Sequence, residues 1–570
     1  MKWTRLHSRA LSLASLPLLL IATACGGDDD ETLPQLSAAT PGTLSGTCAS
    51  LAGRLTALAN TTITATTDVA AGTLTVAGQP VPQHCRVTGS MYSRVGTDGN
   101  NYAIGFEMRL PNAWNGRFFY QGNGGIDGSV VTATGAVNGG GGLTNALAMG
   151  FAVISSDAGH AGSLGPNFGA DPQARLDYGY QAAQKLTPMA KSLITTAYGK
   201  GPDRSYFGGC SNGGRHTMVA MNRLAEQYDG FLAGAPGYNL PKAAIANIFG
   251  AQRYATVATN PADLSTAFTA AERTTVATAI LAKCDALDGS SDGIVQDVEA
   301  CRTAFNFQND VPTCTGARDG SCLTTAQKSA IAPIFSGAVT STGSSFYASF
   351  PYDPGIAGGG IPFWEFIAPV ALDTGGVGII WKVPPEPVAG FNGPAFALGM
   401  NIDTALGWIT ATNATYTESA MSFMTPPDPT NLATLKNRGA KVMVYHGVAD
   451  PIFSVDDTKA WYDGLRARNG GDATGNFAKF YRGPGMGHCS GGPATDQFDM
   501  LTPLVAWVEQ GTIPGAITAT ARGAGNPAGV NADLPAGWSA NRTRPLCPYP
   551  LVARYKGTGD IELASSFACQ

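Results

Sequence analysis

The chain has 570 residues, of which 44% are hydrophobic and 14% charged, and this composition is typical of a globular protein with a large core. Its formal net charge is −5 and no basic run occurs, so we expect no nucleic-acid partner, because that function requires a basic face. The 73 glycines and 36 prolines are spread along the chain, which favours a loop-rich protein over low-complexity sequence.

The first 24 residues have the pattern of an export signal. Three basic residues precede the apolar segment Leu11 to Ala22, which is too short to remain as a membrane span. Small residues then lead directly to Cys25. We therefore predict a lipoprotein-type signal peptide over 1–24 and lipidation of Cys25; an ordinary secretory signal is the alternative. Removing the three positive charges changes the net charge from −5 to −8.

The composition after the signal indicates an exported protein. Residues 25–45 are rich in Asp, Thr, Pro and Ser, and we predict a disordered tether. Of eleven cysteines, ten remain if Cys25 carries lipid, an even number that fits an oxidising compartment. We expect an outer-membrane or periplasmic lipoprotein, or a secreted protein, that meets a membrane only through this anchor. Short spacing favours the pairs Cys284–Cys301 and Cys314–Cys322.

Strands and helices alternate from residue 46 to 238. The predicted strands are Thr62–Thr66, Thr73–Val76, Tyr102–Leu110, Arg117–Gln121, Phe151–Asp157, Ser205–Phe207 and Phe231–Pro236, and the predicted helices are Gln173–Tyr198 and the segment that begins after Ser211. Strands that alternate with helices indicate a mainly parallel sheet.

This alternation stops over residues 239–429 and resumes over 430–570. The middle segment is helical and irregular by turns, with clustered aromatic residues at Phe363–Phe366. Afterwards we predict a buried strand at Ala440–Gly447, helices at Thr458–Arg468 and Gln497–Gln510, and a strand at Phe477–Tyr481. The simplest organisation is one α/β domain with a large inserted lid.

A glycine-flanked serine stands between a predicted strand and a predicted helix. Gly209-Cys210-Ser211-Asn212-Gly213 fits G-x-S-x-G, the nucleophile elbow of α/β-hydrolases. Glycines two residues before and after the serine remove Cβ atoms that would clash in so sharp a turn. The alternative is a glycine-rich turn with a bystander serine, so the pentapeptide needs support from a base and an acid.

Chain order selects the partners of Ser211. In α/β-hydrolases the acid and then the histidine follow the serine, each in a loop after a strand. His488 and Asp450 meet this requirement. The remaining histidines do not: His7 lies in the signal, His84 and His160 precede the serine, His216 lies on the helix after it, and His446 lies inside a strand. We predict Ser211 as nucleophile, His488 as base and Asp450 as the acid that orients it.

Two further features support this assignment. Cys210 precedes the serine and Cys489 follows the histidine, so a disulfide between them would fix nucleophile and base together. The oxyanion hole should combine the N–H of Asn212 with one from the earlier loop Gly122–Gly125. The alternatives are cysteines with other partners and a plain glycine turn.

The segment Cys284–Val295 has the composition of a calcium loop. Three aspartates alternate with glycine turns, and Ca²⁺ binds six to eight oxygen ligands. The segment lacks the terminal glutamate of an EF-hand, and an acidic surface turn is an equally good interpretation. A calcium ion here would be structural, because the segment lies far along the chain from the predicted catalytic residues.

The sequence resembles the tannase/feruloyl esterase family, and within it the bacterial MHETase-type branch. The resemblance rests on Gly209–Arg215, Gly485–Pro493, Asn115–Phe119, Gly234–Tyr238 and Asp499–Glu509, and it extends from Cys48 to Cys569. It implies an α/β-hydrolase fold with a lid and the catalytic residues selected above.

The resemblance also implies details that spacing alone leaves open. The oxyanion donors would be Gly125 and Asn212, and Phe453 and Trp364 would contact the substrate ring. The implied disulfides are Cys48–Cys85, Cys210–Cys489, Cys284–Cys301, Cys314–Cys322 and Cys547–Cys569. The implied Ca²⁺ ligands are Asp285, Asp288, Ser290, Asp292 and Ile294.

One departure from the MHETase-type branch concerns the lid. That branch holds the free carboxylate of a terephthalate monoester with an arginine, but residues 366–384 contain none, and Lys382 is their only cation. Feruloyl or galloyl esters are therefore as well supported as terephthalate monoesters. We expect a monomeric serine carboxylester hydrolase without an organic cofactor. The alternatives are a non-catalytic surface binding lipoprotein on a hydrolase scaffold and a serine peptidase of the same fold.

Overall fold

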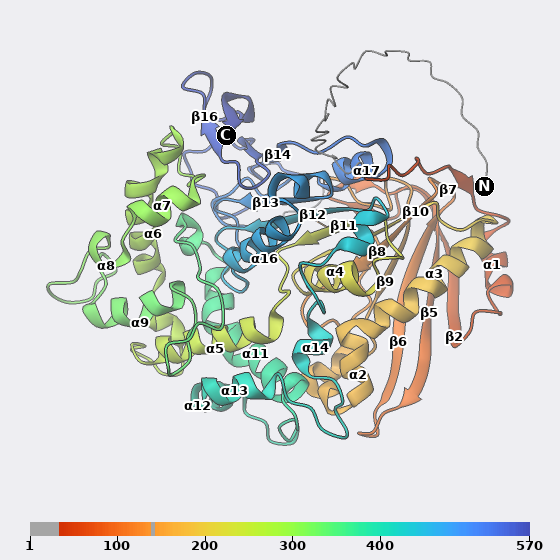
Figure 1. The fold of residues 1–570 in the computed structure, drawn as a ribbon, viewed down its shortest axis with the longest axis horizontal. Helices are drawn as coiled ribbons and strands as arrows, with labels where there is room; N and C mark the ends of the chain where they lie inside the picture. Colours follow the sequence, from red (N-terminus) through yellow and green to blue (C-terminus); the bar gives the residue numbers. More distant parts are fainter. Residues whose placement is uncertain (1–32, 138–142) are drawn as a thin grey trace, which may run out of the picture.

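A nine-stranded sheet forms the centre of the molecule (Figure 1). The strand order is β13-β12-β11-β10-β8-β9-β6-β5-β2; neighbours from β13 to β9 are parallel, and β6, β5 and β2 are added antiparallel. The strands are β2 (Thr61–Val69), β5 (His84–Val95), β6 (Asn101–Pro111), β8 (Arg117–Gly122), β9 (Ala152–Ser156), β10 (Arg204–Cys210), β11 (Gly230–Gly234), β12 (Lys441–Gly447) and β13 (Ala478–Gly483). The predicted α/β-hydrolase class and mainly parallel sheet are confirmed, whereas β5 was not predicted.

The computed structural model describes residues 33–137 and 143–570. The predicted signal peptide, Cys25 and the start of the tether lie outside the described residues. We predicted disorder for the whole tether, but residues 33–45 are ordered, because they are held against the sheet domain. Gln35 Nε2 donates to Val508 O at 2.8 Å, the Ala39 N–H donates to Glu509 Oε2 at 2.9 Å, and Gly42–Thr43 (β1) pairs with β7 (Ala113–Trp114).

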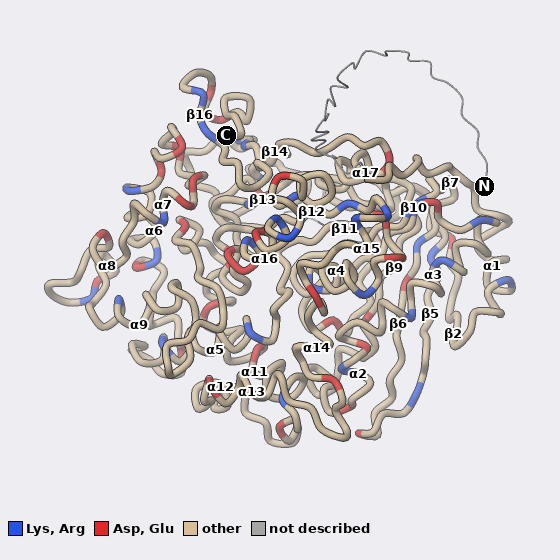
Figure 2. The backbone as a smooth tube through the Cα atoms, in the orientation of Figure 1, with Lys and Arg blue, Asp and Glu red and all other residues tan. Residues whose placement is uncertain are grey.

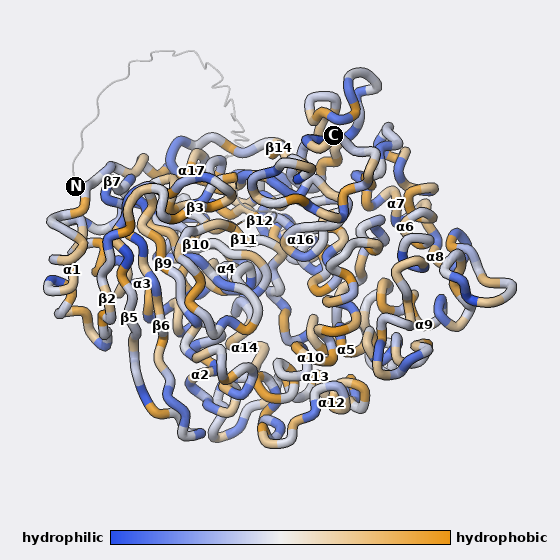
Figure 3. The backbone as a smooth tube through the Cα atoms, turned by 180° about the vertical axis from the view of Figure 1, so that it is seen from behind, coloured by the Kyte–Doolittle hydropathy of each residue, from blue (hydrophilic) through white to orange (hydrophobic). Residues whose placement is uncertain are grey.

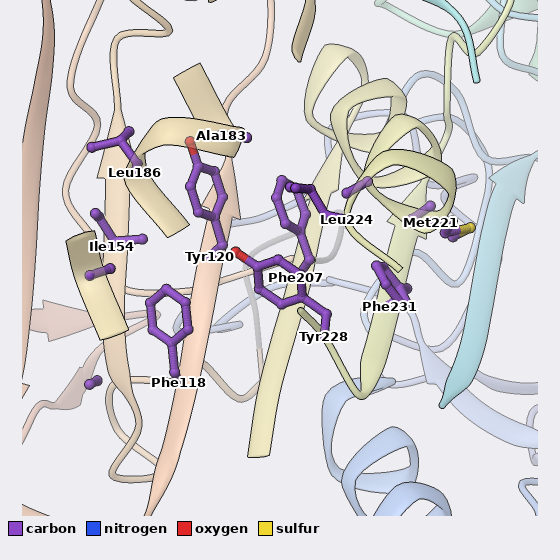
Figure 4. Packing of buried hydrophobic residues seen from close by; sticks show 14 of the residues in the cluster. Phe118, Tyr120, Ile154, Ala183, Leu186, Phe207, Met221, Leu224, Tyr228 and Phe231 are labelled. Atoms are coloured by element: carbon purple, nitrogen blue, oxygen red, sulfur yellow. The ribbon is translucent and has the colours of Figure 1, made fainter. Parts of the chain in front are cut away.

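Helices cover both faces of the sheet because the parallel strands are apolar on both sides. Successive residues point to opposite faces: Phe118 and Tyr120 belong to one core cluster and Phe119 to another. The first cluster packs under α3 (Ala182–Tyr198), α4 (Asn212–Arg223) and α16 (Val455–Arg468), and Figure 4 shows its aromatic centre, where the rings of Tyr120 and Phe207 stack 4.5 Å apart. The second cluster packs under α17 (Leu501–Gln510).

The lid lies between β11 and β12 in the sequence and beside the sheet in space (Figure 1). Its core consists of one apolar cluster within the lid and a second cluster that it shares with sheet-domain residues such as Tyr178 and Phe453. Its helices are α5 (Leu240–Ala255), α6 (Ala270–Cys284), α7 (Val298–Ala304), α8 (Phe307–Asp310), α9 (Thr325–Phe335), α10 (Ala368–Ala371), α11 (Asp373–Gly375), α12 (Gly393–Gly399), α13 (Ile402–Trp408) and α14 (Ala420–Met424). The described residues contain one helical run long and apolar enough to cross a membrane, Pro362–Trp381, and 61% of its apolar window is buried in the protein, as in a core helix.

Charge and hydropathy are distributed evenly over both parts. Figure 2 shows basic and acidic residues interspersed along the chain, without a basic face. Figure 3 shows apolar and polar segments alternating through the sheet domain and the lid.

Candidate active site

The serine predicted as nucleophile sits at the junction of β10 and α4 in a strained turn. Ser211 has φ 64° and ψ −126°, which a residue with a side chain rarely adopts. The flanking glycines permit this turn: a Cβ on Gly209 would lie 2.4 Å, and one on Gly213 2.3 Å, from the carbonyl oxygen of Gly122. The strain thus holds Ser211 at the carboxyl edge of the sheet, as a nucleophile elbow does.

Three side chains from separate loops converge at this turn. His488 Nε2 lies 2.8 Å from Ser211 Oγ, and His488 Nδ1 lies 2.8 Å from Asp450 Oδ2. Asp450 follows β12, and His488 follows β13. The structure therefore brings together the three residues that chain order selected, with the spacing of a serine, base and acid relay.

Asp450 is fully buried and held by four groups. Its Oδ1 accepts the N–H groups of Ile452 at 3.0 Å and Phe453 at 3.1 Å, and its Oδ2 faces both His488 and His446. Burial alone would raise the pKa of Asp450, but the charge of His488 and hydrogen bonds from both histidines lower it well below its ordinary value. The carboxylate consequently stays ionised, as an orienting acid must.

His446 is a contact of this site that the sequence reasoning missed. It was set aside as a base because it lies inside β12, and it does not replace His488. Its Nε2 is 3.2 Å from Asp450 Oδ2 and 2.9 Å from Phe453 O, and its Nδ1 is 2.9 Å from Thr458 Oγ1. The available signal was local: Asp450 lies four residues after His446, and the chain turns between them at the end of β12.

The other described histidines have partners elsewhere. His84 bonds Pro82 O through Nδ1 at 2.7 Å, His160 stacks on Phe168, and His216 Nε2 faces Asp127 Oδ2 at 3.2 Å. The partner of His216, Asp127, lies in the loop after β8.

All five disulfides implied by the resemblance are present: Cys48–Cys85, Cys210–Cys489, Cys284–Cys301, Cys314–Cys322 and Cys547–Cys569. The second of them joins the residue before Ser211 to the residue after His488, with the Cα atoms 6.2 Å apart. It ties the loops of Ser211 and His488 together, as predicted, and five disulfides fit an extracellular protein.

The two candidate oxyanion donors belong to the start of α4 and to the loop after β8. Asn212 is the first residue of α4, and Gly125 has φ 64° in the loop after β8. That loop reaches the serine, because a Cβ on Gly124 would be 3.9 Å from Ser211 Cβ. The start of the helix and the loop therefore approach one another beside Ser211.

Two aromatic rings contact the base. Trp364 of the lid and Phe453 of the sheet domain meet the His488 ring edge to face, with centroids 4.8 and 5.3 Å away. Beside His488 and Trp364 lies a cavity of about 230 Å³ lined largely by glycines and by Asp533. The resemblance had placed both rings near a substrate, and the structure places both at His488.

The calcium segment forms a tight loop in the lid. Asp285 Oδ1 accepts the N–H groups of Asp292 and Gly293, and Asp292 Oδ2 pairs with Arg544 at 2.5 Å. Asp288 Oδ2 is buried without a hydrogen-bond partner. Across residues 33–137 and 143–570, no three acidic, histidine or cysteine side chains already converge on one point to hold an ion. The oxygen-only donors and the unpartnered Asp288 oxygen nevertheless fit Ca²⁺ chemically.

The sheet order, the strained serine turn, the Ser-His-Asp contacts and the inserted lid define an α/β-hydrolase. A family model described as tannase and feruloyl esterase matches residues 85–570. The chain belongs to this family of carboxylic ester hydrolases.

Individual relatives agree with the family. The chain is 39% identical over 533 residues to mono(2-hydroxyethyl) terephthalate hydrolase of Piscinibacter sakaiensis, covering 87% of this chain and 86% of that protein. It is 26% identical over 495 residues to feruloyl esterase C of Talaromyces stipitatus, covering 83% and 84%. The crystal structure of feruloyl esterase B from Aspergillus oryzae has the same fold, with a TM-score of 0.70 at 23% identity, covering 91% of this chain and 100% of that one.

Proposed function

We propose that the protein is a serine carboxylester hydrolase that cleaves esters of aromatic acids through an acyl-enzyme. The observation that carries this proposal is the hydrogen-bonded series from Ser211 Oγ through His488 to Asp450, built on a strained elbow. Two aromatic rings at the base, Trp364 and Phe453, favour a flat aromatic substrate.

The geometry supports a two-step reaction. Ser211 Oγ attacks the ester carbonyl while His488 Nε2 takes its proton, and Asp450 stabilises the resulting imidazolium. The N–H groups of Gly125 and Asn212 hold the oxyanion. His488 then gives the proton to the leaving alcohol, and a water molecule activated by the same histidine releases the aromatic acid.

Residues 366–384 of the lid offer no unpaired cation to bind a free carboxylate on the substrate. Lys382, the only cation of residues 366–384, pairs with Glu386 and lies over the Trp408 ring. The relative from Piscinibacter sakaiensis is named for a terephthalate monoester and others for feruloyl esters. A panel of methyl ferulate, methyl gallate and mono(2-hydroxyethyl) terephthalate separates the three, and we expect the neutral esters to be turned over at least as well as the anionic one.

Ser211→Ala tests the mechanism. We expect turnover to fall by about 10⁴-fold or more, because the remaining oxyanion hole cannot supply a nucleophile, while the thermal unfolding midpoint stays within a few degrees of the wild type. Initial rates with p-nitrophenyl acetate and a melting curve measure both. Retained ester hydrolysis would contradict the serine mechanism.

The same assay addresses the two alternatives. A binding lipoprotein would show no turnover of any ester in the wild type. A peptidase would also cleave the corresponding peptide amides, which an esterase would leave intact.

We also propose that the lid loop binds a structural Ca²⁺. Asp285, Asp288 and Asp292 with the carbonyls of Ser290 and Ile294 would hold it, and the unpartnered Asp288 oxygen supports this. The ion would link turns around Gly289 and Gly293. Chelation with EDTA should lower the melting temperature by several degrees, and added Ca²⁺ but not Mg²⁺ should restore it. An unchanged melting curve would contradict the site.

The cellular setting completes the proposal. We propose export, with Cys25 as a lipid anchor to a membrane or with release as a secreted monomer, and a small aromatic ester as the partner. Mass spectrometry of the mature N-terminus distinguishes lipidated Cys25 from a free one.

A further inference from the structure

The side chain of Asn212 is held at both ends. Its Oδ1 accepts from Arg215 Nε at 2.6 Å, and its Nδ2 donates to Asp127 Oδ1. The residue is buried, with 2% of its surface exposed. Its amide therefore has little freedom to rotate, although only its backbone N–H is needed for the oxyanion.

Asp127 belongs to the other half of the oxyanion hole. It lies two residues after Gly125, and its N–H donates to Gly124 O at 3.2 Å, closing a turn around that donor. Its side chain is 3% exposed. The carboxylate thus bridges from the loop after β8 to the first residue of α4.

The bridge is embedded in a paired network. Asp127 Oδ2 lies 3.2 Å from His216 Nε2, and Arg215 Nη2 lies 3.0 Å from His216 Nδ1. Arg215 is completely buried and donates to Gly179 O at 2.8 Å. A buried carboxylate is costly unless it is hydrogen-bonded, and Asp127 faces the Asn212 amide and the His216 ring.

The separation of the two donors explains why such a bridge matters. Strands β8 and β10 pair up to Gly122 and Gly209, but Gly125 and Asn212 lie beyond this pairing. An oxyanion hole works only when its N–H groups lie about 2.7–3.1 Å from the oxyanion position. The Asp127–Asn212 contact spans this unpaired gap.

We propose that Asp127 is a positioning residue of the oxyanion hole, which fixes the Gly125 and Asn212 N–H groups relative to each other through the Asn212 side chain. This inference rests on the proposed serine esterase function. It assigns a role to Asp127 without contact between its carboxylate and the substrate. It also assigns Arg215 and His216 the task of holding that carboxylate in place.

Asp127→Ala should lower kcat for an aromatic methyl ester about 10- to 100-fold with KM changed less than about threefold, because loosened donors weaken transition-state binding most. Binding of an aryl boronic acid, which forms a tetrahedral adduct with the serine, should weaken by a similar factor. Binding of the aromatic acid product should not change. Asp127→Asn, whose amide oxygen can still accept from Asn212, should keep most of the activity lost in Asp127→Ala.

A double-mutant cycle separates this role from a general structural one. Asn212→Ala keeps the backbone N–H and should reproduce the loss, and the double variant should lose little more. Asp499→Ala, which removes an aspartate that accepts N–H groups at the start of α17, is the matched control and should leave kcat unchanged.

The assignment would be overturned if Asp127→Ala and Asn212→Ala both kept the wild-type kcat. It would also be overturned if the two losses in kcat multiplied in the double variant while the affinity for the boronic acid stayed at the wild-type value. Should Asp127→Ala not fold, Asn212→Ala and Asp127→Asn carry the same comparison. Wild-type turnover that depends on Ser211 would leave the proposed function standing in either case.

Discussion

Asp157 is a carboxyl group whose surroundings favour its neutral form. Burial raises its pKa to about 7, and Asp127 contributes in the same direction, although the N–H groups of Gly105 and Gly159 oppose the shift. Both N–H groups are accepted by Oδ1, at 3.0 and 2.8 Å. Between pH 4 and 7 the folded chain therefore holds a proton at Asp157 that the unfolded chain releases.

This proton gives the first prediction. Because the folded state binds more protons there, Asp157 makes the free energy of unfolding fall as pH rises from about 4 to 7. Asp157→Asn keeps Oδ1 as acceptor and removes the titration, so the variant should be more stable than wild type at pH 8, by about 4 kcal/mol. Urea unfolding across pH measures the difference. It should vanish near pH 3, and parallel curves over the whole range would contradict the prediction.

At the residue scale, the sequence predicted what chain order and spacing encode. Ser211, Asp450 and His488 follow an order that the fold imposes, so they could be selected without coordinates. Asp127 could not be selected, whereas His446 was missed although Asp450 lies only four residues after it. The contacts of Asp127 with Asn212 and His216 join segments that only the folded sheet brings together.

At the scale of elements, the turn between β10 and α4 depends on close backbone approach. A Cβ on Gly213 would lie 2.3 Å from the carbonyl oxygen of Gly122 in β8 and 3.1 Å from that of Asn123. These obstacles are backbone atoms, which cannot move aside without displacing β8. The glycine is therefore a packing requirement between helix and strand.

Gly213→Ala should consequently destabilise the protein by about 2 kcal/mol or more and lower kcat, because the helix start must shift away from the strand. Gly407→Ala in α13 is the matched control: no atom lies within 4 Å of its added Cβ, so stability should hold or rise by about 0.5 kcal/mol. Melting curves and initial rates test both. Equal behaviour of the two variants would contradict the packing argument.

Sequence patterns predicted most of the strands of the central sheet, but not strand β5 or the first residues of helices α16 and α17. Buried parallel strands such as β12 are continuous apolar runs and were predicted. Strand β5 was missed because its alternation of Cys85, Val87 and Met91 is interrupted at Gly89, where Thr62 O and the Phe106 ring leave no room for a side chain. Helix α16 begins three residues before its predicted start, and helix α17 begins four residues after its predicted start.

At the scale of the molecule, the lid interval was visible in the sequence because the strand–helix alternation stops there. Its internal arrangement was not, because two separate apolar clusters are assembled from short helices with irregular connections. The resemblance to a family, rather than spacing, supplied the long-range disulfides.

The Cys210–Cys489 disulfide closes a covalent ring with a sequence separation of 279 residues, and the whole lid lies on that ring. A protease that cuts the lid once, away from its internal disulfides, would open the ring without dividing the molecule. The nicked protein should therefore migrate as a single species on a non-reducing gel and as two fragments after reduction; two fragments without reductant would contradict the linkage. A lid attached in this way would stay joined to the segment that carries Ser211 after a single cut.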